Sequence, residues 1–342
     1  MGCSSAYLLN ELEHDGYVIK LLKGYSVARY YAYPECRDSV DIDIWISPEQ
    51  EADVCAYFEQ KGFQILERGL TSHHSICQHQ RYGKIEVHVK LYDEIVEKVW
   101  FGGMDERDFV QESFEIVEAS DEKYTTLGVT DQLIFLSLHM IKHFIKGGLS
   151  IRMMLDFTLH YAKNKDSIDD DRYWNMLRQL HYEELISSVL WIMIKHGGFS
   201  EADFLGISEY KSDCVNILLV DLALGGYMGV KESSRPESGM EFNRQLLLKQ
   251  KNPLQYNMYM LGWKLRSGLK HMFPSAKFMR KQYSVLKKAP WLLPFAWVYQ
   301  MISFPIEKIS QGVLKRDIRH SEDDLNEIAK RRVEMFKQLG MI

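Results

Sequence analysis

Up to about residue 90, the spacing of hydrophobic and polar positions changes repeatedly between a strand-like and a helix-like period. Runs with a period of two or rich in β-branched residues predict strands, and glycines and prolines mark the breaks between them. Tyr82-Gly83 predicts a hairpin turn. The expected strands are residues 17–23, 39–47, 63–67, 74–80 and 84–91, and the expected helices are a tyrosine-rich segment between Gly24 and Pro34 and residues 49–61.

Strand signals end near residue 130, where helical periodicity takes over. Residues 131–145 are apolar almost all round, which is typical of a buried helix. The segment before this change, near residues 105–130, is rich in Asp and Glu and is the expected domain boundary. We therefore predict an α+β protein, with a small mixed-sheet domain over residues 1–125 and a mostly α-helical domain over residues 126–342. Further helical periodicity falls at residues 151–161, 171–196, 211–229, 241–271 and 321–338.

Length and composition agree with this organisation. A chain of 342 residues exceeds the usual size of one core, and 46% hydrophobic with 26% charged residues is the balance of a folded globular protein. The 5 cysteines never have a C-x-x-C spacing, which favours a reduced, cytoplasmic protein without a zinc framework. Residues 289–305 are the most apolar stretch, but 17 residues with three prolines are a poor membrane span, so we predict no transmembrane segment.

The net charge of −5 hides two regions of opposite sign. Residues 1–243 carry 23 basic and 40 acidic side chains, whereas residues 244–319 carry 15 basic and 2 acidic ones. Aromatic residues are interleaved with the basic ones, so this basic C-terminal region can bind an anionic partner: a polyphosphate, RNA or an anionic membrane surface. Packing of the same region against the acidic N-terminal region of its own molecule is an equally open alternative.

The segment Asp41-Ile42-Asp43 carries the most informative chemistry. In a strand, residues i and i+2 point to the same face, roughly 6.5–7 Å apart, so the two carboxylates repel each other unless a cation neutralises them. Oxygen ligands of this kind suit Mg²⁺ or Mn²⁺, and a pair of such ions is the arrangement that phosphoryl transfer uses. Glu86 can join Asp41 and Asp43 if its strand pairs beside theirs.

Candidate phosphate-binding residues precede the acidic strand. Lys23 and Gly24 close one strand and open a helix, where backbone N–H groups can approach a phosphate. Ser26 can add a hydroxyl group. Arg37, four residues before Asp41, either contacts phosphate or caps its turn.

A second basic group lies on the first helix after residue 126. His139, Lys142, His143 and Lys146 share one helix face, which either contacts phosphate groups or is simply solvated. Arg152 and Asp156, four residues apart on the next helix, favour a structural ion pair. The other histidines near the acidic strand show no ligand spacing: His73, His74 and His79.

These motifs together resemble the uncharacterised bacterial nucleotidyltransferase family of the DNA polymerase beta-like superfamily. The resemblance rests on Lys23-Gly24, Tyr33-Pro34, Arg37, Asp41-Ile42-Asp43-Ile44 and Ile85-Glu86-Val87-His88, and continues through His139, Lys142, Arg152 and Asp156 to Phe273-Pro274 and Trp291-Leu292-Leu293-Pro294. It implies an α+β nucleotidyltransferase domain with a helical partner. It also implies Mg²⁺-dependent transfer of a nucleoside monophosphate from an NTP to an acceptor. The resemblance does not identify the acceptor, which the sequence leaves open between a small molecule, a protein and RNA.

The family pattern also implies roles for the acidic residues. Asp41 and Asp43 would hold both metal ions, and Glu86 would be the third ligand and the base that takes the proton of the acceptor hydroxyl. The turn departs from the superfamily, which usually has Gly-Gly or Gly-Ser where this chain has Gly24-Tyr25-Ser26. This departure motivates a second hypothesis, a non-catalytic nucleotide-binding or assembly protein on the same fold that acts through residues 244–319. A third is peripheral membrane attachment through residues 277–306.

Overall fold

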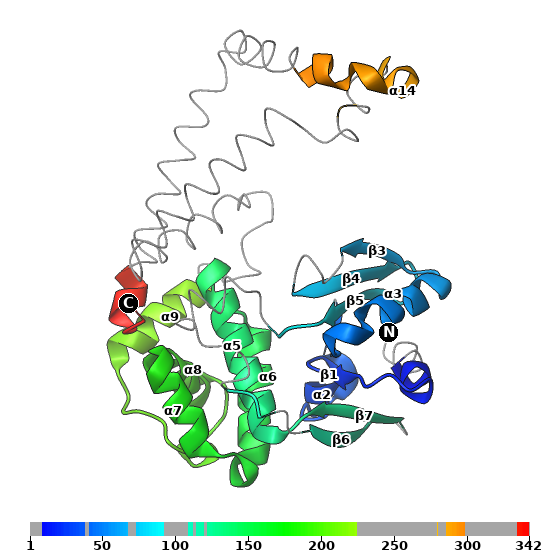
Figure 1. Cartoon of the computed structure of the whole chain (residues 1–342). Helices are drawn as coiled ribbons and strands as arrows, with labels where there is room; N and C mark the ends of the chain where they lie inside the picture. The colour runs from blue at the N-terminus through cyan, green and yellow to red at the C-terminus, as the bar shows by residue number, and fades with distance from the viewer. Residues whose placement is uncertain are drawn as a thin grey trace. The chain divides into compact units, whose positions relative to one another are not determined.

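The computed structural model of the chain describes residues 9–37, 41–67, 73–91, 109–111, 114–119, 122–223, 279, 285–297 and 334–341. The chain divides into two compact units, which are Met1–Pro236 with Phe336–Met341, and Glu237–Met335 with Ile342. The first unit holds a mixed sheet and the helices that follow it, so the predicted α+β class is confirmed (Figure 1). The division at residues 125 and 126 remains a prediction.

One mixed sheet of 7 strands has the order β3-β4-β5-β2-β1-β7-β6. β2 runs parallel to β5 and β1 runs parallel to β7, while the other neighbours are antiparallel. The strands are β1 (Lys20–Leu21), β2 (Asp41–Trp45), β3 (Gln64–Glu67), β4 (His74–His79), β5 (Gly83–His88), β6 (Phe114–Ala119) and β7 (Glu122–Leu127).

A helix covers one face of the sheet. Pro48 opens the 3-10 turn Pro48–Gln50, which leads into α3 (Glu51–Gln60), because the fixed φ of proline suits a helix start. Phe58 of α3 packs in one hydrophobic cluster with Ile44 of β2 and Val87 of β5, all of them fully buried. Since side chains alternate along a strand, the neighbours of these core residues point to the other face.

Several predicted elements are present with shorter bounds. The strands expected at 39–47, 63–67, 74–80 and 84–91 form β2 to β5, and Gly83 has the positive φ of 79° that a tight hairpin turn requires. The strand expected at 17–23 contains only the two residues of β1. The tyrosine-rich helix is likewise short. Only α2 (Tyr25–Ala28) forms in this segment, and a 3-10 turn follows at Pro34–Cys36.

The acidic segment near residues 105–130 was predicted only as a boundary, but it contains the hairpin of β6 and β7. β6 is an edge strand with exposed positions such as Ile116, so composition alone does not reveal it. β7 is held in the sheet by its parallel pairing with β1, and the hydroxyl of Thr126 donates to the carbonyl of Leu21 (2.6 Å). β7 is therefore identified by its contacts with a segment that is distant in the sequence, and not by its local pattern.

A group of helices follows β7 directly and lies next to the sheet (Figure 1). α5 begins after Gly128 and is largely buried, as its apolar pattern predicts. No helix among the described residues is long and apolar enough to cross a membrane, and a cytoplasmic location remains a prediction. The helices are α5 (Val129–Gly147), α6 (Ile151–Asn164), α7 (Asp170–Leu180), α8 (Glu183–His196) and α9 (Ser212–Ala223), with 3-10 turns at Lys165–Ser167 and Glu201–Asp203.

In the second unit the structure describes only short segments. They contain α14 (Val285–Lys288) and a 3-10 turn at Pro290–Leu292, which falls in the apolar stretch 289–305. Most of the basic region 244–319 lies outside the described residues, as do the helices predicted at 241–271 and most of 321–338. The partner expected for this region therefore stays a prediction.

His160 links α6 to the start of α5 and makes the fold sensitive to acid. Its ring is fully buried, and Nε2 donates to the carbonyl of Val129 (2.8 Å). Burial lowers the pKa of His160 to about 4, from an ordinary value of 6.5. Between these two pH values the unfolded chain binds a proton that the folded chain does not, so stability falls as the pH falls.

We expect acidification from pH 7 to pH 5 to lower the free energy of unfolding by about 2 kcal/mol through this residue. Urea unfolding followed by tryptophan fluorescence should show a smaller loss between the two pH values in His160→Gln than in the wild type. His14→Gln is the control, because its ring is 90% exposed. An equal loss in His160→Gln and the wild type would contradict this assignment.

Candidate active site

The predicted acidic strand and its partner lie side by side in the sheet. The parallel register of β2 and β5 pairs Asp43 with Glu86 and Asp41 with Lys84. Asp41, Asp43 and Glu86 therefore share the face of the sheet that is turned away from α3. Asp43 is the most buried of the three, at 2% exposure, whereas the other two are partly exposed. Glu86 was expected to join Asp41 and Asp43 if its strand pairs beside theirs, and β5 does pair with β2.

Lys23 lies two residues after β1 and places its positive charge beside both aspartates. Its Nζ is 3.0 Å from Oδ2 of Asp43 and 3.9 Å from Oδ1 of Asp41. Burial alone would raise the pKa of Asp43, but the charge of Lys23 and a hydrogen bond from His88 lower it well below the ordinary value. Burial alone would likewise lower the pKa of Lys23, but the two aspartates raise it. Both groups are therefore charged at neutral pH.

Two further cationic or basic side chains contact the acidic face. Nζ of Lys84 is 2.6 Å from Oε1 of Glu86 and 3.3 Å from Oδ2 of Asp41. Nε2 of His88 is 3.1 Å from Oδ1 of Asp43 and 3.7 Å from Oε2 of Glu86. Neither residue is among those predicted for the site from the sequence. Their positions in the strand would have identified them, because Lys84 and His88 lie two residues before and after Glu86 and so share its face.

The acidic face has the donor chemistry of a divalent-cation site. One ligand atom from each of Asp43, Glu86 and His88 lies within 4.8 Å of the others. Carboxylate oxygens are the ligands that Mg²⁺ and Mn²⁺ prefer, and Asp41 adds a further carboxylate on the same face. Crowded carboxylates also attract the lysines that contact them here.

The turn after β1 is built on glycine. Gly24 has φ 81° and ψ −110°, a conformation that side chains disfavour, and α2 starts directly after it. The buried hydroxyl of Ser26 donates to the carbonyl of Leu22 (3.3 Å), and Nε2 of Gln132 on α5 donates to the same carbonyl. Ser26 thus holds the turn together in this structure, and its predicted contact with phosphate remains a prediction.

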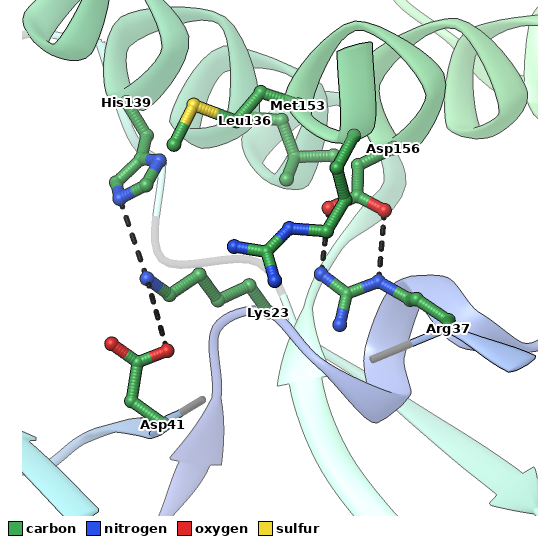
Figure 2. A pocket seen from close by; sticks show the side chains of 8 residues that line it. Lys23, Arg37, Asp41, Leu136, His139, Met153 and Asp156 are labelled. Atoms are coloured by element: carbon green, nitrogen blue, oxygen red, sulfur yellow. Dashed lines mark hydrogen bonds and ion pairs between the residues drawn. The ribbon is translucent and has the colours of Figure 1, made fainter. Parts of the chain in front are cut away.

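α5 brings His139 to the site. Nζ of Lys23 donates to Nε2 of His139 (3.4 Å), so Lys23 lies between that ring and Asp41 (Figure 2). Burial, and then the charge of Lys23, hold the pKa of His139 well below its ordinary value, so the ring is neutral. His143 lies one turn further along, with its Nε2 3.3 Å from that of His139. Lys142 is half-buried on the same helix and is close enough to lower the pKa of His74.

A pocket opens between the acidic strand and the helices. Lys23, Arg37, Asp41 and His139 line it together with α6 residues such as Asp156 (Figure 2). Four of the residues predicted from the sequence therefore meet at one pocket, although they come from four separate segments. The predicted roles of all these residues in binding and catalysis remain proposals.

Arg37 is held in this pocket by α6. Its guanidinium donates to both carboxylate oxygens of Asp156 (2.8 and 2.6 Å), and the hydroxyl of Tyr31 donates to the same carboxylate (2.7 Å). The arginine and aspartate side chains are only 4% and 8% exposed. The spacing of Arg152 and Asp156 predicts a pair within α6, and sequence spacing does not reveal the partner that the segment before β2 supplies.

Three histidines form a cluster that sequence analysis missed. His73 and His74 lie before and at the start of β4, and His88 ends β5. The ring nitrogens Nδ1 of His74 and Nε2 of His73 are 2.8 Å apart, and the rings of His74 and His88 have centroids 5.2 Å apart. Burial, and then the charge of His88, lower the pKa of His74. The predicted hairpin could have revealed part of this cluster, since its register places His74 opposite His88.

A match to a known family identifies the class of protein as a nucleotidyltransferase. A family described as uncharacterised nucleotidyltransferase matches residues 4–196, which is more than half of the chain and includes every residue assigned to the site. The chain belongs to this family. The resemblance noted from its motifs is thereby confirmed.

Solved structures with detectable likeness include three nucleotidyltransferases or related proteins. The lincosamide antibiotic adenylyltransferase LnuA, bound to lincomycin, is 18% identical over 47% of this chain and 96% of its own, with a TM-score of 0.35. The antibiotic-resistance factor ANT(2'')-Ia is 9% identical over 58% and 100%, with a TM-score of 0.39. An antigenic nucleotidyltransferase-like protein from Paracoccidioides brasiliensis is 13% identical over 58% and 89%, with a TM-score of 0.31. No curated protein matches the chain.

We expect Arg37→Met to lower the free energy of unfolding by about 3–5 kcal/mol, because it leaves the buried carboxylate of Asp156 without its cation. Arg178→Met is a matched control, since Arg178 pairs with Glu183 at the surface, where the side chains are 51% and 35% exposed. The control should lose about 1 kcal/mol or less. Urea denaturation measures both, and losses of similar size would show that the buried pair contributes no more than an exposed one.

Proposed function

We propose that the protein transfers a nucleoside monophosphate from an NTP to a hydroxyl group on an acceptor, with release of pyrophosphate, in a reaction that depends on Mg²⁺ or Mn²⁺. The observation that carries this proposal is the register of β2 and β5, which puts Asp41, Asp43 and Glu86 on one face. Membership of the nucleotidyltransferase family supports the reaction class. The neighbouring pocket, with its lysine and arginine, supports binding of an anionic substrate.

The acidic residues fit the metal ions that the family implies. Asp41 and Asp43 would hold two ions, and Glu86 would be the third ligand, because all three offer carboxylate oxygens on one face. When bound, the ions supply neutralisation of the charge on the phosphates. Lys23 and Lys84 already contact these carboxylates, which shows that the face accepts positive charge.

The remaining steps belong to the side chains of the chain. Glu86 accepts the proton of the acceptor hydroxyl at a carboxylate oxygen, and Lys84 (2.6 Å) orients that carboxylate. Lys23 and Arg37 meet the negative charge of the triphosphate at the pocket. His139 is neutral, so it offers hydrogen bonding without adding to the charge of the site. Gly24 leaves room for the chain to turn into α2 beside these groups.

We expect Asp41→Asn and Asp43→Asn each to reduce turnover about a hundredfold or more, the loss typical when a group that stabilises transition-state charge is removed. Incubation of the purified protein with each α-labelled NTP, Mg²⁺ and a cell extract reports where the label goes. Isothermal titration calorimetry with Mg²⁺ and the accepted NTP measures binding separately. Asp53→Asn is the control, because Asp53 is an exposed carboxylate on α3, on the opposite face of the sheet.

Three outcomes separate the hypotheses. Labelled acceptor that disappears in both site variants supports the transfer reaction. Nucleotide binding without transfer to any component of the extract favours the nucleotide-binding or assembly protein. Unchanged binding and turnover in both variants would show that the acidic face does not form the site.

A further inference from the structure

We propose that His73, His74 and His88 form a binding site for a transition-metal ion such as Zn²⁺, beside the carboxylate site that His88 also contacts. One ring nitrogen from each lies within 4.8 Å of the other two. Imidazole nitrogens suit zinc, copper, nickel and iron, whereas Mg²⁺ prefers oxygen ligands, so the two sites would select different ions. Three protein ligands also leave a fourth position for water or another ligand, as an open zinc site does.

The backbone of the sheet positions these histidines. The antiparallel register of β4 and β5 places His74 directly opposite His88. Directly opposite residues have side chains on the same face and close together. The carbonyl of His73 accepts from the N–H groups of Val89 (3.0 Å) and Lys90 (3.2 Å), which fixes the chain where it enters β4. Two of the three histidines therefore lie on paired strands, and His73 directly precedes β4.

The hydrogen bonding of His88 prepares one nitrogen for a metal. Nε2 faces the carboxylate of Asp43 (3.1 Å), which can only accept, so Nε2 carries a proton. Nδ1 is buried and has no hydrogen-bond partner within the described part of the chain. His88 itself is 4% exposed. A carboxylate that accepts from one nitrogen of an imidazole while the other binds a metal is the usual outer shell of such sites.

Charged side chains of both signs surround the three rings. Glu86 and Glu67 act on His74 with negative charge, and His88 and Lys142 act on it with positive charge. Asp43 lies beside His88, but Lys23 and Lys84 already pair with Asp43 and Glu86. The geometry of the three rings and the buried Nδ1 of His88, and not the surrounding charge, favour an ion here.

Calorimetric titration of the metal-free, full-length protein with ZnCl₂ tests the proposal. We expect His74→Gln to weaken Zn²⁺ binding about tenfold or more, since even outer-shell partners of metal ligands contribute 10–100-fold. Binding of Mg²⁺ should be unchanged in this variant, because β5 separates the strand of His74 from the strand of the aspartates. The control is His79→Gln, a histidine on the same strand outside the cluster, which should bind Zn²⁺ as the wild type does.

Competing sites give different results. Unchanged Zn²⁺ affinity in His74→Gln would overturn the proposal. So would a loss confined to His143→Gln, which would assign the ion to the His139–His143 pair, or a loss confined to Asp41→Asn, which would assign it to the acidic face. If circular dichroism shows that His74→Gln is unfolded, His73→Gln takes its place with the same expectation. None of these outcomes depends on nucleotidyl transfer, so the proposed function can fail or hold independently.

Discussion

Three carboxylates crowded on one face of a sheet are the constraint on which the site depends. The parallel register of β2 and β5 brings Glu86 beside Asp43, and Asp43 is almost completely buried. A buried carboxylate stays ionised only if positive charge or hydrogen bonds compensate its lost hydration. Lys23 and His88 supply that compensation from the neighbouring strands. The same electrostatic demand makes the face attractive to divalent cations.

The helices complete the site by contacts with the residues around the turn after β1. Gln132 of α5 donates to the carbonyl of Leu22, and His139 accepts from Lys23. The pair of Arg37 and Asp156 ties the segment before β2 to α6. A buried ion pair of this kind adds little net stability compared with apolar packing, but it is costly to break. It therefore fixes the geometry of the pocket as much as it stabilises the fold.

His88 connects two kinds of ligand chemistry within a few ångströms. One nitrogen faces the carboxylates, and the ring packs beside the two histidines that precede and begin β4. Histidine suits such a link because one ring nitrogen can donate a hydrogen bond while the other, without a proton, can bind a metal. An ion at the three rings would also hold Asp43 indirectly, through the hydrogen bond that His88 donates.

Local pattern made much of this structure predictable. The alternation of Asp41-Ile42-Asp43 and of Ile85-Glu86-Val87 identified the strands and the polar face, and Tyr82-Gly83 identified the hairpin. The hairpin of β6 and β7 was not predicted, because an acidic edge strand has no distinctive pattern. β7 also depends on its pairing with β1, a two-residue strand far away in the chain.

The sequence by itself determined the class of the fold and the acidic face that β2 and β5 form, since strand periodicity acts over a few neighbouring residues. Only the tertiary structure decided that Arg37 pairs with Asp156, that Lys84 lies between Asp41 and Glu86, and which histidines meet. These contacts join segments that are remote in sequence, and their partners are chosen by strand register and helix packing. Periodicity within one segment carries no information about either.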